Sequence, residues 1–166
     1  MKLRTLTTSL LTATILLALA AGVALAAVTW HSGPTVTFNG TTSVTVTGDG
    51  SGFGNQPAVA TLTVNALVQY TCQNKGGAQA PGRNPVAASS SGSQDIGNAD
   101  HNGRGIINLT VSFTPAATVP GKSIGCPNGN WTGVNPVSSG ITSATLTITQ
   151  GNNTIFGPQT YDNPNN

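Results

Sequence analysis

Glutamate is absent from the sequence, and charged residues of every kind are scarce. Only 6% of the 166 residues are charged, and histidine occurs twice, at His31 and His101. The paired glutamates of many glycosidases are thereby excluded, although two aspartates could in principle meet. Neither histidine lies beside a recognisable nucleophile motif, and we expect no nucleophile elbow of the G-x-S-x-G type. The sequence therefore favours a protein that is not an enzyme.

Residues 1–26 have the features of a secretory signal peptide. Lys2 and Arg4 form a positive start, Leu10–Val23 is apolar and uncharged, and Ala24-Leu25-Ala26 matches a cleavage-site pattern. An uncleaved membrane anchor is the alternative, because the apolar run is nearly long enough to span a bilayer. Basic residues precede the run and none follow it closely, which favours the signal peptide. We expect a secreted protein with no membrane association after cleavage.

The charge balance changes once the signal peptide is removed. The full sequence has six basic and four acidic residues, but Lys2 and Arg4 belong to the signal. The remaining charges cancel, so the mature chain gives no case for binding nucleic acid or an anionic membrane. These charges are Lys75, Arg83, Arg104 and Lys122 against Asp49, Asp95, Asp100 and Asp162.

The chain has only two cysteines, Cys72 and Cys126. In an exported protein such a pair favours a disulfide. A metal site is a weaker alternative, since two thiols with no histidine nearby supply too few ligands, and free thiols are the other. A bridge that closes so long a loop contributes about 4 kcal/mol in the chain-entropy treatment.

The longest regular pattern in the sequence runs from Ala58 to Cys72. Every second residue there is apolar, and the residues between are mostly polar. This period of two is typical of a strand with one face in a core. Such a strand would span about 50 Å, which is too long for one straight strand. We therefore expect a bulge or bend near Asn65. One form of such a bend would let the strand pass from one sheet to the other.

Shorter alternating segments flank this strand. Thr35–Phe38 and Thr42–Thr47 are separated by Asn39-Gly40, a strong hairpin signal. Alternation returns at Ile107–Phe113 and at Ala144–Ile148. The irregular stretches between these segments are expected to be loops, over residues 48–54, about 73–104 and about 115–139.

No segment has helical periodicity, and turn residues recur throughout the chain. The sequence therefore predicts an all-β protein, an antiparallel β-sandwich that is immunoglobulin-like in the broad sense. The cysteine and tryptophan spacing of antibody domains is absent, so the topology stays open, and a small β-barrel is the alternative. The roughly 140 residues after the signal peptide, 27–166, suit a single domain.

The segment Tyr70–Gly77, YTCQNKGG, is followed by Pro81-Gly82 and later by Cys126-Pro127. In these features the chain resembles a group of small exported bacterial proteins that have threonine-rich strands and no assigned function. The resemblance covers most of the mature chain. It implies secretion, a β fold and one disulfide, and it implies no particular chemistry.

The segment Asp95–Gly105, DIGNADHNGRG, is similar to the first half of a calcium-binding loop. Oxygen-bearing side chains alternate there before a glycine that suits a sharp turn. The acidic residue that closes such loops is missing, because Leu109 stands in its place. Weak calcium binding is one hypothesis and a plain turn is the other, and no other cofactor is expected. The candidate ligands are Asp95, Asn98, Asp100 and Asn102.

Aromatic residues offer a further candidate site in the segment Cys126–Gly133, CPNGNWTG. Its Trp131, near the amides of Asn128 and Asn130, could stack on a sugar ring or anchor a partner. The alternative is that Trp131 folds back to cover an open end of the sandwich. The other large aromatic residues of interest, Trp30, Tyr70 and Phe113, are expected to face the core.

Threonine-rich faces and few charges leave exposed edge strands weakly protected against pairing with other chains. One copy could therefore lend its Val28–Phe38 segment to a neighbour's sheet. We also expect the loop 73–104 and the segment Cys126–Gly133 to lie at one end, joined by the disulfide. The resulting hypothesis is binding or assembly at the cell surface or outside the cell, with a glycan or further copies of the chain as partner.

Overall fold

The computed structural model describes residues 28–53, 57–97 and 103–165, and every regular element in them is a β-strand. No helix long and apolar enough to cross a bilayer occurs within these ranges. The predicted all-β class is confirmed. In chain order the strands are β1 (Thr29–Asn39), β2 (Ser43–Ser51), β3 (Ala58–Gln73), β4 (Gln79–Pro81), β5 (Val86–Gly97), β6 (Gly105–Ser112), β7 (Val119–Pro120), β8 (Thr132–Gln150) and β9 (Asn153–Asp162).

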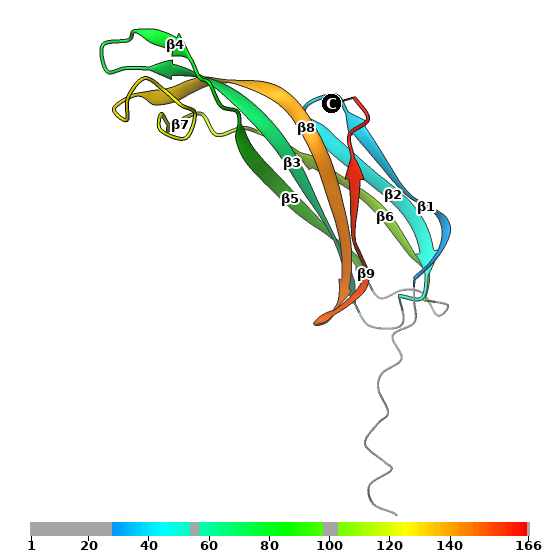
Figure 1. Ribbon diagram of the computed structural model, residues 1–166. Coiled ribbons are helices and arrows are strands. Elements are labelled where there is room, and N and C mark those ends of the chain that lie inside the picture. Colours follow the sequence, from blue (N-terminus) through cyan, green and yellow to red (C-terminus); the bar gives the residue numbers. More distant parts are fainter. Residues whose placement is uncertain (1–27, 54–56, 98–102, 166) are drawn as a thin grey trace, which may run out of the picture.

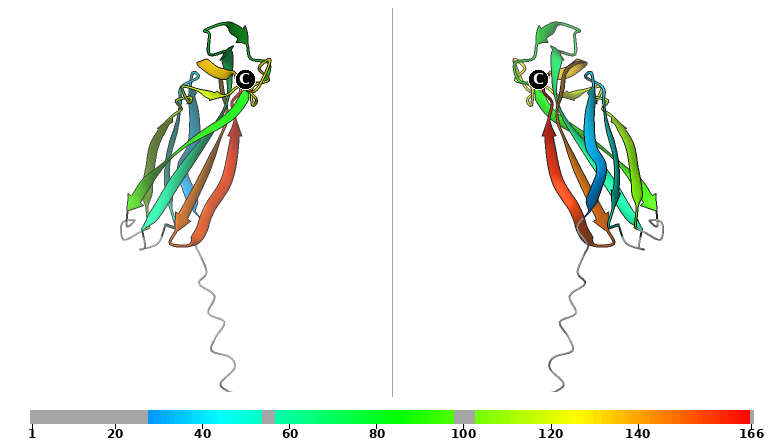
Figure 2. Two further views of the ribbon diagram at one scale, coloured as in Figure 1. Left: turned by 90° about the vertical axis from the view of Figure 1, so that its left-hand side faces the viewer. Right: turned by 90° about the vertical axis from the view of Figure 1, so that its right-hand side faces the viewer.

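The strands form two antiparallel sheets that pack face to face as a β-sandwich (Figures 1 and 2). The smaller sheet has the order β1-β2-β6. In the larger sheet β3 and β8 are central, β5 and β4 pair with β3, and β9 and β7 pair with β8. The larger sheet extends beyond the smaller one at the end where β4 and β7 lie (Figure 1).

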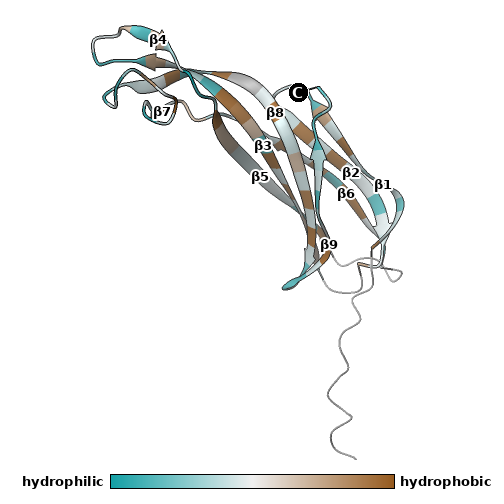
Figure 3. Cartoon of the chain, viewed as in Figure 1, coloured by the Kyte–Doolittle hydropathy of each residue, from teal (hydrophilic) through white to brown (hydrophobic). Residues whose placement is uncertain are grey.

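β3 is the strand that the pattern from Ala58 to Cys72 predicts, with Gln73 added. Its alternate residues are buried, and hydrophobic bands recur along it in Figure 3. Fully burying one valine or leucine side chain contributes about 1.5–3 kcal/mol, so the core shared by the two sheets holds them together. This core combines residues of β2, β3, β6 and β8, among them Val44, Val46, Leu62, Val64, Leu109, Val111, Leu146 and Ile148.

β8 carries an extra residue opposite Asn65, where the sequence predicts a bulge or bend. Asn65 pairs with Ser143 and the next residue, Ala66, pairs with Ile141, so Thr142 is left over. Thr142 Oγ1 donates a hydrogen bond to the carbonyl oxygen of Asn65 at 3.1 Å. The irregularity is confirmed. The suggested passage between sheets is wrong, because β3 stays in the larger sheet along its whole length.

The predicted loop over residues 73–104 is wrong for its larger part, because β4 and β5 lie within it. β5 pairs with β3 and packs closely on β6. A Cβ atom on Gly92 of β5 would lie 2.9 Å from a methyl carbon of Val111 on β6. Such close packing excludes large side chains, so this strand is built from small residues and lacks the hydrophobic alternation that marks the others.

Two other predicted loops are also strand in part. β2 continues through Gly48 and Gly50, where a Cβ on Gly48 would lie 2.8 Å from the ring of Trp30. These glycines therefore provide a flat surface on which the indole packs, and they are not turn residues. Within the predicted loop 115–139 lie β7 and the first residues of β8, which begins at Thr132.

Side-chain hydrogen bonds close one side of the sandwich, between β5 and β6. The amide of Gln94 donates to the carbonyl of Ile106 at 3.2 Å and accepts from the N–H of Asn108 at 2.8 Å. Ser90 Oγ donates to the carbonyl of Ser112 at 3.0 Å. These bonds occupy backbone groups of β6 that a foreign strand would need.

β1 and β9 are the edge strands on the other side, and both are interrupted by the same kind of bulge. Gly33-Pro34 of β1 and Gly157-Pro158 of β9 each place two residues opposite one on the neighbouring strand. Both glycines have positive φ, 83° and 78°. A kinked edge whose proline has no N–H is a poor template for another strand. The edges are thus better protected than the threonine-rich faces and scarce charges predict.

Candidate functional site

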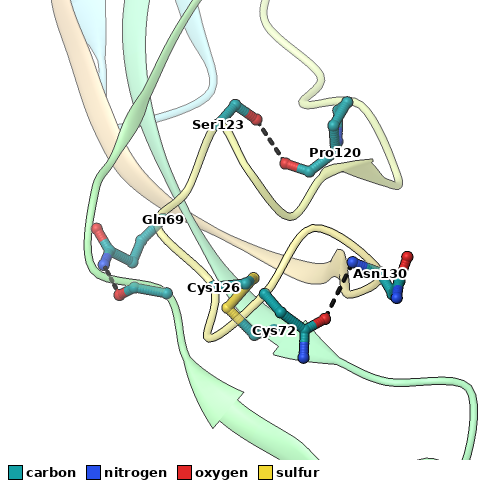
Figure 4. The surroundings of a disulfide bond; sticks show 8 residues. Gln69, Cys72, Pro120, Ser123, Cys126 and Asn130 are labelled. Atoms are coloured by element: carbon teal, nitrogen blue, oxygen red, sulfur yellow. Dashed lines mark hydrogen bonds between the residues drawn. A yellow bond between two sulfur atoms is a disulfide. The ribbon is translucent and has the colours of Figure 1, made fainter.

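The predicted disulfide between Cys72 and Cys126 is confirmed, and it organises one end of the molecule (Figure 4). Cys72 lies near the end of β3, and Cys126 lies in the turn that follows β7, 54 residues later. Their Cα atoms are 5.7 Å apart. The bridge therefore attaches an irregular segment to the extended part of the larger sheet.

Backbone hydrogen bonds hold that segment in a compact turn. The N–H of Cys126 donates to the carbonyl of Gly121 at 2.9 Å, and the N–H of Gly121 donates to the carbonyl of Trp131 at 3.0 Å. A Cβ on Gly121 would lie 2.3 Å from the Trp131 carbonyl oxygen. Only glycine fits this position, and it allows the two chain segments to come together beside the disulfide.

Asn128 shapes the part of the turn that carries the tryptophan. Its side-chain oxygen accepts from the N–H of Asn130 at 3.0 Å, and its carbonyl accepts from the N–H of Trp131 at 3.3 Å. Short asparagine side chains stabilise turns in this way. The turn leaves the side chain of Asn130 exposed, and the ring of Trp131 half-buried at its end.

A second turn, 74–78, faces the first and follows directly from Cys72. The side-chain oxygen of Asn74 accepts from the N–H of Ala78 at 2.9 Å. The N–H of Asn74 donates to the carbonyl of Ala78, and the N–H of Gly77 to the carbonyl of Asn74, both at 3.0 Å. Gly77 has a φ of 83°, which favours glycine. This turn presents Lys75 and Gly76 to solvent.

The two turns enclose an open pocket of about 280 Å³, which we call the disulfide-end pocket. Its polar lining comes from both turns. The structure brings together the three residues predicted as ligand-binding, Asn128, Asn130 and Trp131. The sequence prediction missed the other lining residues, which come from the turn 74–78. The lining residues are Asn74, Lys75, Gly76, Asn128, Asn130 and Trp131.

The missed residues of this pocket could have been found from the cysteines. Asn74, Lys75 and Gly76 follow Cys72 after a single residue, Gln73, and a single residue also separates Asn128 from Cys126, the predicted partner of Cys72. A disulfide brings the residues beside each cysteine together, so both neighbourhoods belong to one surface. The prediction that residues 73–104 lie at this end as one loop is right for the turn 74–78 and wrong for β5, which runs along β3 to its far end, where Gly97 pairs with Ala58.

The position of Trp131 agrees with the expectation that it covers an open end of the sandwich, and its binding role stays a prediction. One side of the residue packs against the hydrophobic core, as expected for a tryptophan that covers an open end of the sandwich. The remainder lines the pocket. A ring held by packing loses little conformational freedom on binding, so it is well suited to stack on a ligand.

The calcium hypothesis concerns the opposite end of β3. Asp95 lies near the end of β5 and pairs with Val59, far along β3 from Cys72. The other candidate ligands, Asn98, Asp100 and Asn102, lie outside the described residues, as does His101. Among the residues that the structure describes, no cluster of three acidic, histidine or cysteine side chains could hold a metal ion. Calcium binding stays a prediction.

An ion pair lies on the smaller sheet, away from the disulfide-end pocket. Arg104 Nε donates to Asp49 Oδ1 at 2.8 Å, and a second guanidinium nitrogen donates to the other carboxylate oxygen. The hydrogen bond from Arg104 holds the pKa of the Asp49 carboxyl below its ordinary value of 3.8, against a smaller opposing effect of burial. The charge of Arg104 contributes further, and that of His31 least.

Gly121–Gly125, GKSIG, matches the G-x-S-x-G pattern, a match that the sequence prediction missed. A nucleophile elbow places its serine between a strand and a helix. Ser123 instead lies in a turn directly after β7, and its Oγ donates to the carbonyl of Pro120 at 2.6 Å. The local structure is therefore that of a closed turn and not of a nucleophile elbow.

Comparisons of the chain with protein-family models, curated proteins and solved structures found no match. The argument about function therefore rests on the geometry of the disulfide-end pocket. The resemblance to small exported bacterial proteins stays a prediction. The roles of Asn74 and Gly77 in the turn 74–78 nevertheless give a physical reason for two residues of the YTCQNKGG segment.

Proposed function

We propose that the protein is a secreted, non-enzymatic binding module that holds an extracellular or cell-surface glycan in the disulfide-end pocket. The observation that carries the proposal is the lining of that pocket by Trp131, Asn128 and Asn130 together. An aromatic face stacks on the C–H groups of a sugar ring, and asparagine amides both donate and accept hydrogen bonds with hydroxyl groups.

The framework around the pocket supports this function because it is rigid before any ligand arrives. The disulfide, the glycine at position 121 and the backbone hydrogen bonds to Trp131 fix the position of the ring. A preorganised site spends less of its binding free energy on ordering side chains. A shallow, open pocket also suits an internal unit of a long polymer, which has to enter from the side.

Export is supported by the disulfide, which persists in oxidising compartments such as the bacterial periplasm and the extracellular space. The predicted signal peptide lies outside the described residues. Enzymatic activity gains no support from Ser123, the one serine in a G-x-S-x-G match, because it closes a turn.

Assembly into fibres by lending of Val28–Phe38 is the weaker alternative. That segment is part of β1, which pairs with β2 of its own chain from Thr29 to Asn39. A neighbour could receive it only if this pairing were first broken. The bulges in β1 and β9 and the hydrogen bonds between β5 and β6 also remove the continuous edges that such pairing needs.

The proposal is tested by retention of the purified mature protein on a panel of immobilised polysaccharides. Trp131→Ala and Asn130→Ala are expected to reduce retention at least tenfold on any polysaccharide that binds. Asn152→Ala is the matched control, since Asn152 is also an exposed asparagine in an N-x-T sequence, in the turn between β8 and β9.

The outcome is read together with circular dichroism, which shows whether each variant is folded. Asn130 is the cleaner variant of the pocket, because its backbone N–H, and not its side chain, bonds to Asn128. Retention that is unchanged in both pocket variants, or absent on every polysaccharide of the panel, contradicts the proposal.

A further inference from the structure

The basic residues of the mature chain are unevenly distributed over the fold. Lys75, Arg83 and Lys122 are all exposed, and all three lie in the segments around the disulfide. Lys75 lines the disulfide-end pocket itself. The mature chain has only four basic residues, so three quarters of its positive charge is gathered at the end where the pocket opens.

The fold brings these three residues together from distant positions in the chain. The N–H groups of Arg83 and Asn84 both donate to the carbonyl of Ile124, at 2.8 and 3.2 Å. The segment with Arg83 is thereby attached to the turn that contains Lys122. The turn that contains Lys122 is also joined to Trp131 by the hydrogen bond from Gly121, and to β3 by the disulfide. Backbone hydrogen bonds and the disulfide therefore hold the three segments that carry these residues together.

The carboxylates of the described residues lie elsewhere. Asp49 is paired with Arg104 on the smaller sheet. In the strand register Asp95 lies opposite Val59, near the start of β3, and Asp162 lies opposite Ser143, next to the bulge. Within residues 28–53, 57–97 and 103–165, no carboxylate lies in the segments around the disulfide, and none forms an ion pair with Lys75, Arg83 or Lys122.

We infer that the ligand of the disulfide-end pocket is an anionic polysaccharide, with carboxylate or sulfate groups on successive sugar units. The inference rests on the proposed function and adds the charge of the ligand. Lys75 would meet an acidic group of the sugar that stacks on Trp131, and Arg83 and Lys122 would attract groups on neighbouring units. The zero net charge of the mature chain conceals this positive region, because the basic and the acidic residues lie in different parts of the fold.

The same surface is poorly suited to the other polyanions. Nucleic acids are bound by several stacked aromatic rings and many phosphate contacts, and this end offers one tryptophan and three cations. Membrane binding needs apolar side chains that insert into the bilayer. The exposed large apolar residues of the described chain are Leu67, Ile106 and Val137, and none of them lines the pocket.

Matched polymers test the inference. The mature protein is titrated with polygalacturonate and with the same polymer after methyl esterification, and with hyaluronan, alginate and chondroitin sulfate beside neutral dextran and galactomannan. At least one acidic polymer is expected to bind at least tenfold more tightly than the neutral ones. Exposed charges are screened beyond about 8 Å at physiological salt, so 0.5 M NaCl should weaken this binding severalfold.

Three variants that each remove one positive charge locate the effect. Lys75→Gln is expected to weaken binding of the acidic polymer about three- to tenfold, and Lys122→Gln to do so by a smaller factor. Arg104→Gln is the matched control, because it changes the net charge equally at a position away from the pocket. An equal loss in all three variants would indicate a nonspecific effect of net charge and would overturn the inference.

The two proposals fail in different ways. Tight, salt-insensitive binding of a neutral polymer that Trp131→Ala abolishes would overturn the anionic ligand and leave the glycan-binding function standing. Binding of no polysaccharide would overturn both. Tighter binding of single-stranded DNA or of vesicles containing phosphatidylglycerol than of any acidic polysaccharide, with loss in Lys75→Gln, would replace the glycan with that partner.

Discussion

Trp30 of β1 packs edge-on against Phe156 of β9, with ring centroids 5.2 Å apart and planes at 84°. The contact joins the edge strands of the two sheets across the open side of the sandwich (Figure 2). Trp30 also packs edge-on against Phe53, at 6.4 Å. Its buried Nε1 has no hydrogen-bond partner among the described residues. An indole is therefore retained there for its shape and in spite of its polar atom.

Replacement of Trp30 should separate the effect of the packed ring on stability from the effect of its unsatisfied N–H. Trp30→Phe removes the unsatisfied N–H, which costs about 1–3 kcal/mol when buried, and keeps an aromatic ring against Phe156. We expect the free energy of unfolding to change by less than about 1 kcal/mol in Trp30→Phe and to fall by about 3 kcal/mol in Trp30→Ala. Urea denaturation measures both, and similar losses in the two variants would contradict the argument.

The disulfide should contribute to stability through the unfolded chain. Replacing both Cys72 and Cys126 by alanine is expected to lower the free energy of unfolding by about 4 kcal/mol. Chemical denaturation of the double variant, beside the unmodified protein with and without a reducing agent, measures the loss. A double variant as stable as the oxidised protein would show that the bridge adds nothing to the sandwich.

Replacement of Gly121 by alanine should destabilise the protein, and the same replacement of Gly129 should not. A Cβ at position 121 would lie 2.3 Å from the carbonyl oxygen of Trp131, whereas nothing lies within 4 Å of one at position 129. Gly121→Ala is expected to cost about 1–3 kcal/mol of unfolding free energy and to weaken ligand binding. Gly129→Ala, in the same turn region, should change stability by less than about 0.5 kcal/mol. Equal thermal stability of the two variants would contradict the close approach.

Acid should remove the stabilising effect of the Asp49–Arg104 pair. The pKa of Asp49 is lower in the folded protein than its ordinary value of 3.8, so the folded state binds this proton less readily than the unfolded state does. The stabilisation is therefore present above about pH 4 and is lost as the pH falls through the folded pKa. Melting curves between pH 2 and 6 should show Arg104→Gln less stable than the unmodified protein at pH 6, and the difference should shrink as the pH falls below 4. A difference that stays constant over this range would contradict a role for the carboxylate charge.

The sequence predicts the parts of the fold in which large apolar residues alternate with polar ones. β3, the β1–β2 hairpin and β6 are of this kind. The sequence predicts a loop in place of β5 because the central inward positions of this strand hold small residues, as at Gly92, and a strand packed closely against another needs no large side chains there. Gly48 and Gly50 also indicate a loop in the sequence, whereas in the structure they are strand residues that make room for Trp30.

The candidate site was predicted in its central part only. Trp131, Asn128 and Asn130 stood out because an aromatic residue among asparagines in a cysteine-containing segment is conspicuous. Lys75 did not stand out, because a single lysine carries no pattern of its own. Lys75 lines one pocket with Trp131 because the disulfide joins the two turns, and no local sequence signal encodes this proximity.

The disulfide end projects past the smaller sheet (Figure 1), and the hydrophobic core continues into it. Val119, Ile124 and Tyr70 meet there over Gly133, and the hydroxyl of Tyr70 donates to the carbonyl of Ala116 at 2.9 Å. The exposed residues of the two turns, such as Lys75, Gly76 and Asn130, take no part in the hydrophobic core, whereas Trp131 packs against it. Under the proposed function, a chain with the same sandwich and other residues at these exposed positions would fold through the same core contacts and recognise a different polymer. In that case specificity would reside in a few exposed turn positions, as it does for loops carried on other rigid scaffolds.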